Sequence, residues 1–143
     1  MKRIVILNGP NLNLLGTREP DVYGNDSLEE LSAQWTDFGK AHGTEVVCLQ
    51  SNVEGELVNW IQEYGFDSQA IILNPGGYTH TSVAIRDAIS AVPSPVYEVH
   101  ISHPDAREDF RKTSLIREVC AGSVSGLGTY GYLAALSGLI NAQ

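Results

Sequence analysis

The chain has 143 residues, and its 9 lysines and arginines against 17 aspartates and glutamates give a formal net charge of −8 at pH 7. This length predicts one domain over residues 1–143, and a chain that is 43% hydrophobic and 18% charged can bury a sizeable core. The acidic balance argues against a nucleic-acid partner or an anionic membrane surface, and because no apolar run approaches about 18 residues, we expect a cytoplasmic protein without a membrane span.

The N-terminal half alternates apolar runs with amphipathic patterns. In chain order, these predict a strand at 4–7, a helix at 28–38, a strand at 46–49 and a helix at 57–64. Ser27 and Glu30 form a capping box at the start of the first helix. The connection from residue 9 to residue 26 is longer than most loops between a strand and a helix, which indicates a lid or binding loop at about 17–25.

The C-terminal half continues the alternation. It predicts strands at 70–73, 96–101 and 122–124, and helices at 81–91, 106–111 and 130–140. The strand runs are continuously apolar, which is typical of parallel strands covered on both faces. Because crossover connections are right-handed, the predicted fold class is α/β: a flavodoxin-like, doubly wound, five-stranded parallel sheet of order 2-1-3-4-5 with helices on both faces.

Polar segments follow three of the predicted strands. In doubly wound sheets, ligands bind beyond the carboxyl ends of the strands, where the strand order reverses. The first strand ends in Asn8-Gly9-Pro10-Asn11, the third in Asn74-Pro75-Gly76-Gly77-Tyr78-Thr79-His80, and the fourth in His100-Ile101-Ser102-His103. Such residues also form ordinary turns, but three segments on neighbouring strands, with histidines in two of them, indicate one pocket.

Three arginines lie near these segments. Arg18 is in the long loop, and Arg107 and Arg111 share one face of the helix predicted at 106–111. Solvated surface charge is the alternative interpretation. Guanidinium groups beside a strand-end pocket of an acidic protein instead indicate an anionic substrate, because a guanidinium pairs with a carboxylate through two parallel hydrogen bonds.

The two cysteines and a glycine-rich segment do not indicate functional sites. Cys48 and Cys120 lie far apart, so neither a metal site nor a disulfide framework is indicated, and buried free thiols are expected. The segment Gly126-Leu127-Gly128-Thr129-Tyr130-Gly131 matches the dinucleotide-binding pattern, but neither a further strand nor an acidic residue follows it. We therefore expect no dinucleotide cofactor.

The long polar segments, taken in order, are 8–20 with 23–24, 50–52, 74–82, 98–102, 106–108 and 110–111. In these segments the chain resembles the type II 3-dehydroquinate dehydratases, and the resemblance covers nearly the whole chain. It implies removal of water from 3-dehydroquinate to give 3-dehydroshikimate, by anti elimination through an enolate and without a metal or an organic cofactor. That reaction serves either aromatic amino-acid biosynthesis through the shikimate pathway or quinate breakdown.

The resemblance also implies a role for each candidate residue. The implied catalytic residues are Tyr23, His100, Asn11, Arg18 and Glu98, and the implied substrate-binding residues are Asn74, His80, Ile101, Ser102, Arg111 and Asp87. Tyr23 would act as the base in its phenolate form beside Arg18, and His100 would act as the acid.

The remaining roles follow from the same resemblance. Glu98 would orient the His100 ring, and Asn11 would stabilise the enolate. The substrate's hydroxyls would meet Asn74, His80 and Arg111, and its carboxylate would meet Ile101 and Ser102. Relatives assemble as dodecamers, tetramers of trimers, in which the counterpart of Asp87 reaches a neighbouring subunit's site.

Lysine scarcity argues independently against the other route to this chemistry, a Schiff base on an enzyme amine, because Lys2, Lys40 and Lys112 lie away from the predicted strand ends. The chain departs from the family pattern at His103, at Asp105 and across 115–120. Two other hypotheses stay open: a protein that binds quinate-like hydroxy acids without turnover, and a flavodoxin-like electron carrier, which would be yellow when purified.

Overall fold

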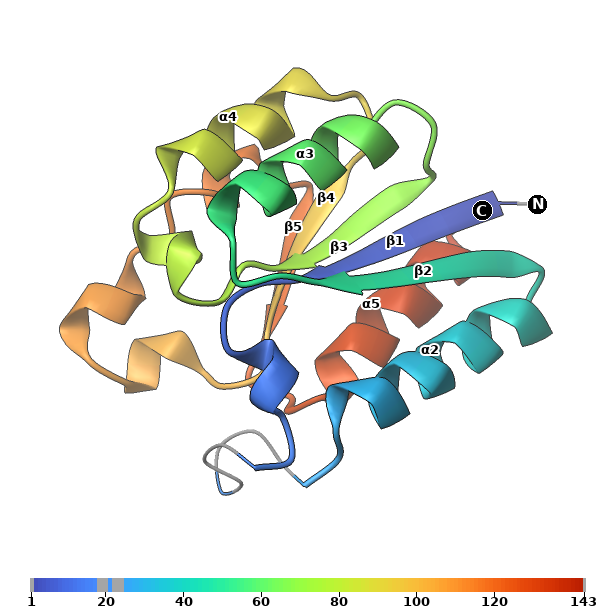
Figure 1. The fold of residues 1–143 in the computed structure, drawn as a ribbon, viewed down its shortest axis with the longest axis horizontal. Helices are drawn as coiled ribbons and strands as arrows, with labels where there is room; N and C mark the ends of the chain where they lie inside the picture. Colours follow the sequence, from blue (N-terminus) through green and yellow to red (C-terminus); the bar gives the residue numbers. More distant parts are fainter. Residues whose placement is uncertain (1, 18–20, 22–24, 143) are drawn as a thin grey trace.

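The computed structural model describes residues 2–17, 21 and 25–142. The strands are β1 (Lys2–Asn8), β2 (Thr44–Gln50), β3 (Ala70–Asn74), β4 (Val96–His100) and β5 (Gly122–Ser125), and the α-helices are α2 (Leu28–Ala41), α3 (Glu54–Tyr64), α4 (Val83–Ala91) and α5 (Tyr130–Asn141). The strands are all parallel and lie in the order β2-β1-β3-β4-β5 (Figure 1). The predicted fold class is therefore confirmed.

Two helices cover each face of the sheet: α2 and α5 lie on one side, and α3 and α4 lie on the other (Figure 1). Side chains of a strand alternate between the two faces, so consecutive residues of β1 enter different cores. Ile4 and Ile6 pack with Trp35 of α2, whereas Val5 and Leu7 pack on the opposite face. This double coverage explains why β1 is a continuous apolar run.

The α-helices begin near the predicted positions, with shifts at their first residues. Helix α3 starts at Glu54, three residues before its first buried residue, Leu57. Helix α4 starts at Val83, because the Ser82 side chain accepts a hydrogen bond from the backbone N–H of Ile85 and caps the helix. The capping box of Ser27 and Glu30 is present at the start of α2. A 3₁₀ helix, η1 (Leu12–Leu14), lies in the long connection before α2.

The prediction of a helix at 106–111 is wrong. The chain there forms two separate 3₁₀ helices, η3 (Pro104–Ala106) and η4 (Asp109–Lys112), because the backbone is extended at Arg107 and Glu108 between them. A continuous helix would need an apolar row to bury, and the one large apolar side chain of the segment, Phe110, is 54% exposed. Two further 3₁₀ helices, η2 (Gly76–His80) and η5 (Arg117–Val119), follow β3 and precede β5.

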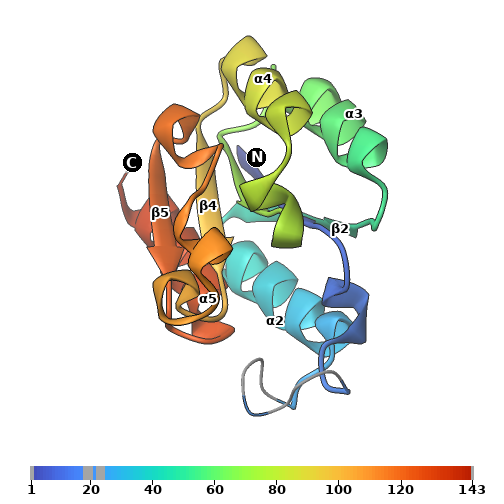
Figure 2. The ribbon, with the colours of Figure 1, turned by 90° about the vertical axis from the view of Figure 1, so that its left-hand side faces the viewer.

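The loops after β1 and β3 cross at very short range. A side chain on Gly9 would place its Cβ 2.6 Å from the carbonyl oxygen of Pro75, and Gly76 has a φ of +61° with its α-carbon facing Pro10. Only glycine tolerates this approach without a shift of the backbone. Because β1, β3 and β4 are parallel neighbours, the segments that follow them lie at one end of the molecule, at the left of Figure 1 and facing the viewer in Figure 2.

Among the described residues, no helix has both the length and the hydropathy that crossing a bilayer demands. Cys48 and Cys120 are both free, as expected, but they are partly buried rather than fully buried.

Candidate active site

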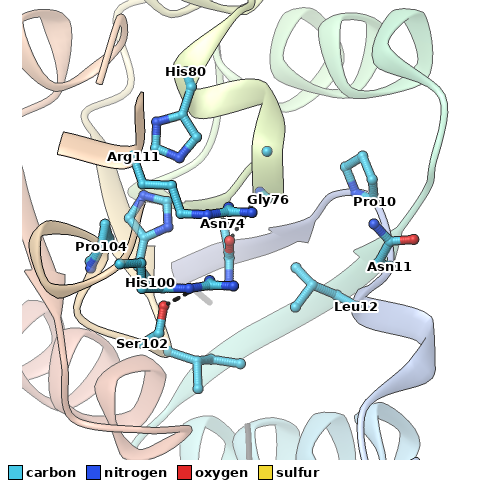
Figure 3. A pocket seen from close by; sticks show the side chains of 13 residues that line it. Pro10, Asn11, Leu12, Asn74, Gly76, His80, His100, Ser102, Pro104 and Arg111 are labelled. Carbon is cyan, nitrogen blue, oxygen red and sulfur yellow. Dashed lines mark hydrogen bonds between the residues drawn. The ribbon is translucent and has the colours of Figure 1, made fainter. Parts of the chain in front are cut away.

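A pocket lies where the three polar segments meet, beyond the carboxyl ends of β1, β3 and β4 (Figure 3). Its volume is about 120 Å³. The lining residues are Pro10, Asn11, Leu12, Asn74, Gly76, Gly77, His80, His100, Ile101, Ser102, Pro104, Arg107 and Arg111. These lining residues include two arginines and two histidines but no carboxylate and no lysine. In a protein of net charge −8, the cationic side chains of this lining make the pocket locally positive.

The first wall of the pocket is the turn after β1, where Pro10, Asn11 and Leu12 lie opposite the histidines (Figure 3). Asn11 has a φ of 71°, a left-handed conformation that asparagine adopts more readily than most residues. Its backbone N–H donates to Asn52 Oδ1 at 3.0 Å, and the Gln50 amide donates to the carbonyl of Gly9 at 3.1 Å. The end of β2 therefore supports this wall without entering the pocket.

The last residue of β4, His100, forms the deepest polar contact. Its Nε2 lies 2.5 Å from Glu98 Oε2, and Glu98 is fully buried. The two residues are two positions apart on one strand, so they share a face of the sheet. A carboxylate oxygen accepts, so Nε2 is the donor of this bond, which fixes the orientation of the ring.

Three more side chains donate to the buried carboxylate. Thr79 Oγ1 donates to Oε2, Ser114 Oγ lies 3.0 Å from Oε2, and Arg117 Nε donates to Oε1 at 3.3 Å. Burial alone raises the pKa of Glu98, but the hydrogen bond and charge of His100, the Thr79 hydroxyl and the Arg117 guanidinium outweigh it and lower the pKa to about 2. The carboxylate is thus ionised throughout the physiological range.

This low pKa predicts how acid affects stability. The ordinary pKa of a glutamate is 4.5, so the ionised Glu98 stabilises the folded chain fully above pH 4.5, and this contribution is lost as the pH falls towards about 2. The difference corresponds to up to about 3 kcal/mol. We expect Glu98→Gln to be less stable than the wild type at pH 7 and to approach it below pH 4.5, as urea unfolding at each pH would measure. A constant difference from pH 7 to pH 3 would contradict this.

His80 enters the pocket from η2, on the side of Arg111 (Figure 3). Its Nδ1 lies 2.6 Å from the backbone oxygen of Thr113, and because a carbonyl oxygen only accepts, Nδ1 is the donor. The other ring nitrogen, Nε2, is left for a ligand. The ring of Phe110 packs edge-on against His80, with the two ring centroids 5.9 Å apart.

The two pocket arginines are held by one exposed carboxylate. Glu108 Oε1 lies 3.0 Å from Arg111 Nε and 3.9 Å from Arg107 Nε. Arg107 also donates from Nη1 to Ser102 Oγ at 3.3 Å. The bend between η3 and η4, which replaces the predicted helix, places both guanidinium groups in the pocket. A substrate-binding role was predicted for Arg111 but not for Arg107, although Arg107 lies closer in sequence to the end of β4.

Asn74 is anchored by a buried chain of hydrogen bonds. Its Nδ2 donates to Tyr132 Oη at 2.8 Å, and that hydroxyl donates to Asn8 Oδ1 at 2.5 Å. Burial raises the pKa of Tyr132, so the hydroxyl stays protonated and can donate. The Oδ1 of Asn74 accepts from the backbone N–H of Gly76 at 3.1 Å. Both ends of the Asn74 amide are therefore fixed.

The glycine-rich segment before α5 supports the pocket from behind. The backbone N–H of Gly126 donates to the carbonyl of Ser102 at 3.0 Å, and that of Gly128 donates to the carbonyl of Ile101 at 3.1 Å. These two hydrogen bonds tie the segment that follows β4 to the segment that precedes α5.

Most predicted site residues meet in or beside this pocket. Asn11, Asn74, His80, His100, Ile101, Ser102 and Arg111 line it, and Glu98 lies behind His100. Asp87 is exposed on α4 and does not line the pocket of its own chain. Arg18 and Tyr23 lie outside the described residues, as does most of the predicted lid. The described residues contain no cluster of three histidine, cysteine or acidic side chains that could hold a metal ion.

Comparison with known proteins identifies the same family across sequence and structure. A family model described as dehydroquinase class II matches residues 2–140. The 3-dehydroquinate dehydratase of Variovorax paradoxus is 48% identical over 145 residues, which cover 98% of this chain and 99% of that protein. Crystal structures of type II dehydroquinases are also similar, from Butyrivibrio crossotus (TM-score 0.93, 44% identity, 96% and 97% of the two chains) and Propionibacterium acnes (TM-score 0.95, 38% identity, 99% and 97%).

Proposed function

The chain belongs to the class II dehydroquinase family, and from this premise we propose that it is a hydro-lyase that converts 3-dehydroquinate to 3-dehydroshikimate. One observation carries the proposal: an otherwise acidic chain holds two arginines and two histidines around one pocket, and one of these histidines is bonded to a buried carboxylate. The arginines suit an anionic hydroxy acid, and the histidine suits proton transfer.

Elimination of water beside a ketone needs a base for the α-proton, a group that stabilises the enolate, and an acid for the departing hydroxyl. We assign the acid to His100. Its Nε2 donates to Glu98, so its other ring nitrogen, Nδ1, is left for a ligand, and the bond to the buried carboxylate holds the ring in place. Asn11 stabilises the enolate from the opposite wall.

The base in this scheme is Tyr23, with Arg18 as the nearby cation, both in the lid predicted at 17–25. The route is an anti elimination that removes the axial proton. The thirteen lining residues of the pocket include no lysine, which supports the enolate route over an imine. Loss of a deuterium label with syn stereochemistry would instead point to imine chemistry.

Substrate hydroxyls are assigned to Asn74, His80 and Arg111. Each has its orientation fixed by a protein partner that leaves a polar group for the ligand: Gly76 and Tyr132 hold Asn74, Thr113 holds His80, and Glu108 holds Arg111. The substrate carboxylate is assigned to the Ser102 side chain and the backbone at Ile101 and Ser102. Such fixed donors reduce the entropy lost on binding.

We further propose a cytoplasmic homo-oligomer, a dodecamer built as a tetramer of trimers, that takes part in aromatic amino-acid biosynthesis or quinate breakdown. Asp87 is exposed on α4. A residue that contacts the site of a neighbouring subunit must lie on the surface of its own chain, so this position is compatible with the proposed assembly. The reaction needs neither a metal nor an organic cofactor in this scheme.

The decisive experiment mixes purified protein with 3-dehydroquinate and follows ultraviolet absorbance. The expected result is growth of the conjugated enone band of 3-dehydroshikimate, at a rate proportional to protein concentration and absent with heat-denatured protein. Binding of 3-dehydroquinate in calorimetry without any enone would contradict the proposal and favour a non-catalytic protein that binds quinate-like hydroxy acids.

A further inference from the structure

Arg117 lies outside the pocket lining and outside every polar segment on which the family resemblance rests. It belongs to residues 115–120, where the chain departs from the family pattern, and it begins η5. Its Nε nevertheless lies 3.3 Å from Oε1 of Glu98, the carboxylate that holds His100. The Arg117 side chain is 40% exposed, whereas the Glu98 side chain is fully buried. The guanidinium therefore caps the buried carboxylate from the solvent side.

Ser114 holds this arrangement in place. Its hydroxyl oxygen accepts from the backbone N–H groups of Ile116 (3.3 Å) and Arg117 (3.1 Å), and the same oxygen lies 3.2 Å and 3.0 Å from the two oxygens of Glu98. Because backbone donors occupy the lone pairs of the hydroxyl, its proton points to the carboxylate. Ser114 thus anchors the turn that carries Arg117 to Glu98, the same carboxylate that the Arg117 side chain binds.

The two oxygens of Glu98 share the Ser114 hydroxyl but differ in their other partners. Oε2 accepts from His100 and Thr79, whereas Oε1 accepts from Arg117. A carboxylate shared in this way offers less negative charge to the imidazole than a carboxylate bonded to the imidazole alone. A positive charge on Arg117 also repels the proton of an imidazolium directly. Both effects have the same sign, and both weaken the hold of His100 on its proton.

We propose that Arg117 is a positioning residue that makes His100 a stronger acid, by binding the second oxygen of the Glu98 carboxylate. The effect on turnover rests on the proposed function, in which His100 is the acid. Arg117 touches neither the pocket nor a ligand in it, so it acts only through Glu98 and through its charge.

The other charged and titratable groups near His100 stay the same when Arg117 is replaced. Among the described residues these are Glu98 on its own strand, His80 from η2, Arg107, Arg111 with its partner Glu108 from η4, and Cys120 near Glu98. Burial, and next the charge of Glu98, raise the pKa of the Cys120 thiol to about 12, so this thiol is neutral. A change in the titration of His100 in an Arg117 variant therefore reports on Arg117.

The experiment follows the His100 ring by NMR during a pH titration of the wild type, Arg117→Met, Arg117→Lys and Glu118→Gln. In Arg117→Met, the midpoint of the ring titration should move to higher pH by about 0.5 to 1 unit, the size expected for one partly screened charge. Arg117→Lys keeps the charge and should restore most of the wild-type midpoint. Glu118→Gln, an exposed neighbour that pairs with Arg86 at 3.6 Å, should leave it unchanged.

Turnover is measured on the same samples. We expect kcat of Arg117→Met to fall by about threefold to tenfold, with KM within about twofold of the wild type and the alkaline limb of the kcat profile displaced to higher pH. A midpoint within about 0.2 of the wild type in Arg117→Met would overturn the inference, whatever happens to kcat. A displaced midpoint with an unchanged kcat profile would uphold the inference and remove His100 as the acid of the proposed reaction.

Discussion

Replacement of His100 by glutamine is expected to lower kcat by about 10²- to 10⁴-fold, because the departing hydroxyl would leave without a proton donor. Glutamine keeps an N–H that can donate to Glu98, so the buried carboxylate retains a partner and the fold is preserved. KM should change much less than kcat, since other lining residues bind the substrate. Steady-state measurement of enone formation separates the two constants.

A matched control is His42→Gln. His42 follows the last residue of α2 and is exposed, and its ring Nδ1 lies 2.8 Å from the Phe38 carbonyl of the same helix. This variant loses the same ring far from the pocket and should keep the wild-type kcat. If His100→Gln retained more than about a tenth of the wild-type kcat, the acid would have to be another group.

The position of the site could be predicted because it follows from the sheet. Once the alternation of strands and helices indicates a parallel sheet of order 2-1-3-4-5, the ends of β1, β3 and β4 must lie together. Asn11, Asn74 and His100 were placed by this argument alone, and the structure brings them to one pocket. Local signals such as the capping box at Ser27 were equally readable, because a cap depends only on residues that are close in sequence.

What the sequence could not reveal are contacts that tertiary folding makes between distant residues. Tyr132 hydrogen-bonds to Asn8 across 124 positions, and Arg117 reaches Glu98 only because η5 turns back towards β4. Neither contact has a motif or a spacing that marks it. Glu98 lies in the middle of an apolar run. The local sequence does not indicate that His100, Thr79, Ser114 and Arg117 all donate hydrogen bonds to its carboxylate.

The segment 104–112 shows a different limit. The alternation of strands and helices predicted a helix there, and Arg107 and Arg111, four positions apart, would share one face of it. The structure gives two 3₁₀ helices, yet both arginines still reach the pocket. Charge spacing alone does not form a helix when no apolar face is available to bury, and Phe110 remains exposed.

The remaining chemical requirement is a base for the α-proton, and the described pocket does not supply one. His100 is bonded to Glu98 and is the proposed acid, and His80 is tied to the Thr113 carbonyl. The two ends of the predicted lid lie close together, because a Cβ on Gly16 would lie 3.0 Å from the carbonyl oxygen of Asn25. The lining residue Leu12 lies four positions before Gly16 in the chain. The base is therefore expected from the segment between Gly16 and Asn25, which contains Tyr23.

A tyrosinate base is energetically feasible in this setting. A free phenol has a pKa near 10, so ionisation near pH 7 requires about 3 units, or about 4 kcal/mol. One guanidinium at ~4 Å in an effective dielectric of ~20 supplies a comparable energy. Arg18 is the arginine of the same loop, and closure of the lid would strengthen the interaction by excluding water.

Tyr23→Phe is therefore expected to reduce kcat by at least ~10²-fold while 3-dehydroquinate still binds. Phenylalanine keeps the ring and removes only the hydroxyl that takes the proton, so the affinity set by the arginines, His80 and Asn74 should survive, as calorimetry on the variant would measure. Tyr130→Phe is the matched control, because that tyrosine is 63% exposed at the start of α5. A near-normal kcat in Tyr23→Phe would remove the phenol from the mechanism and leave the α-proton to a group outside the pocket described here.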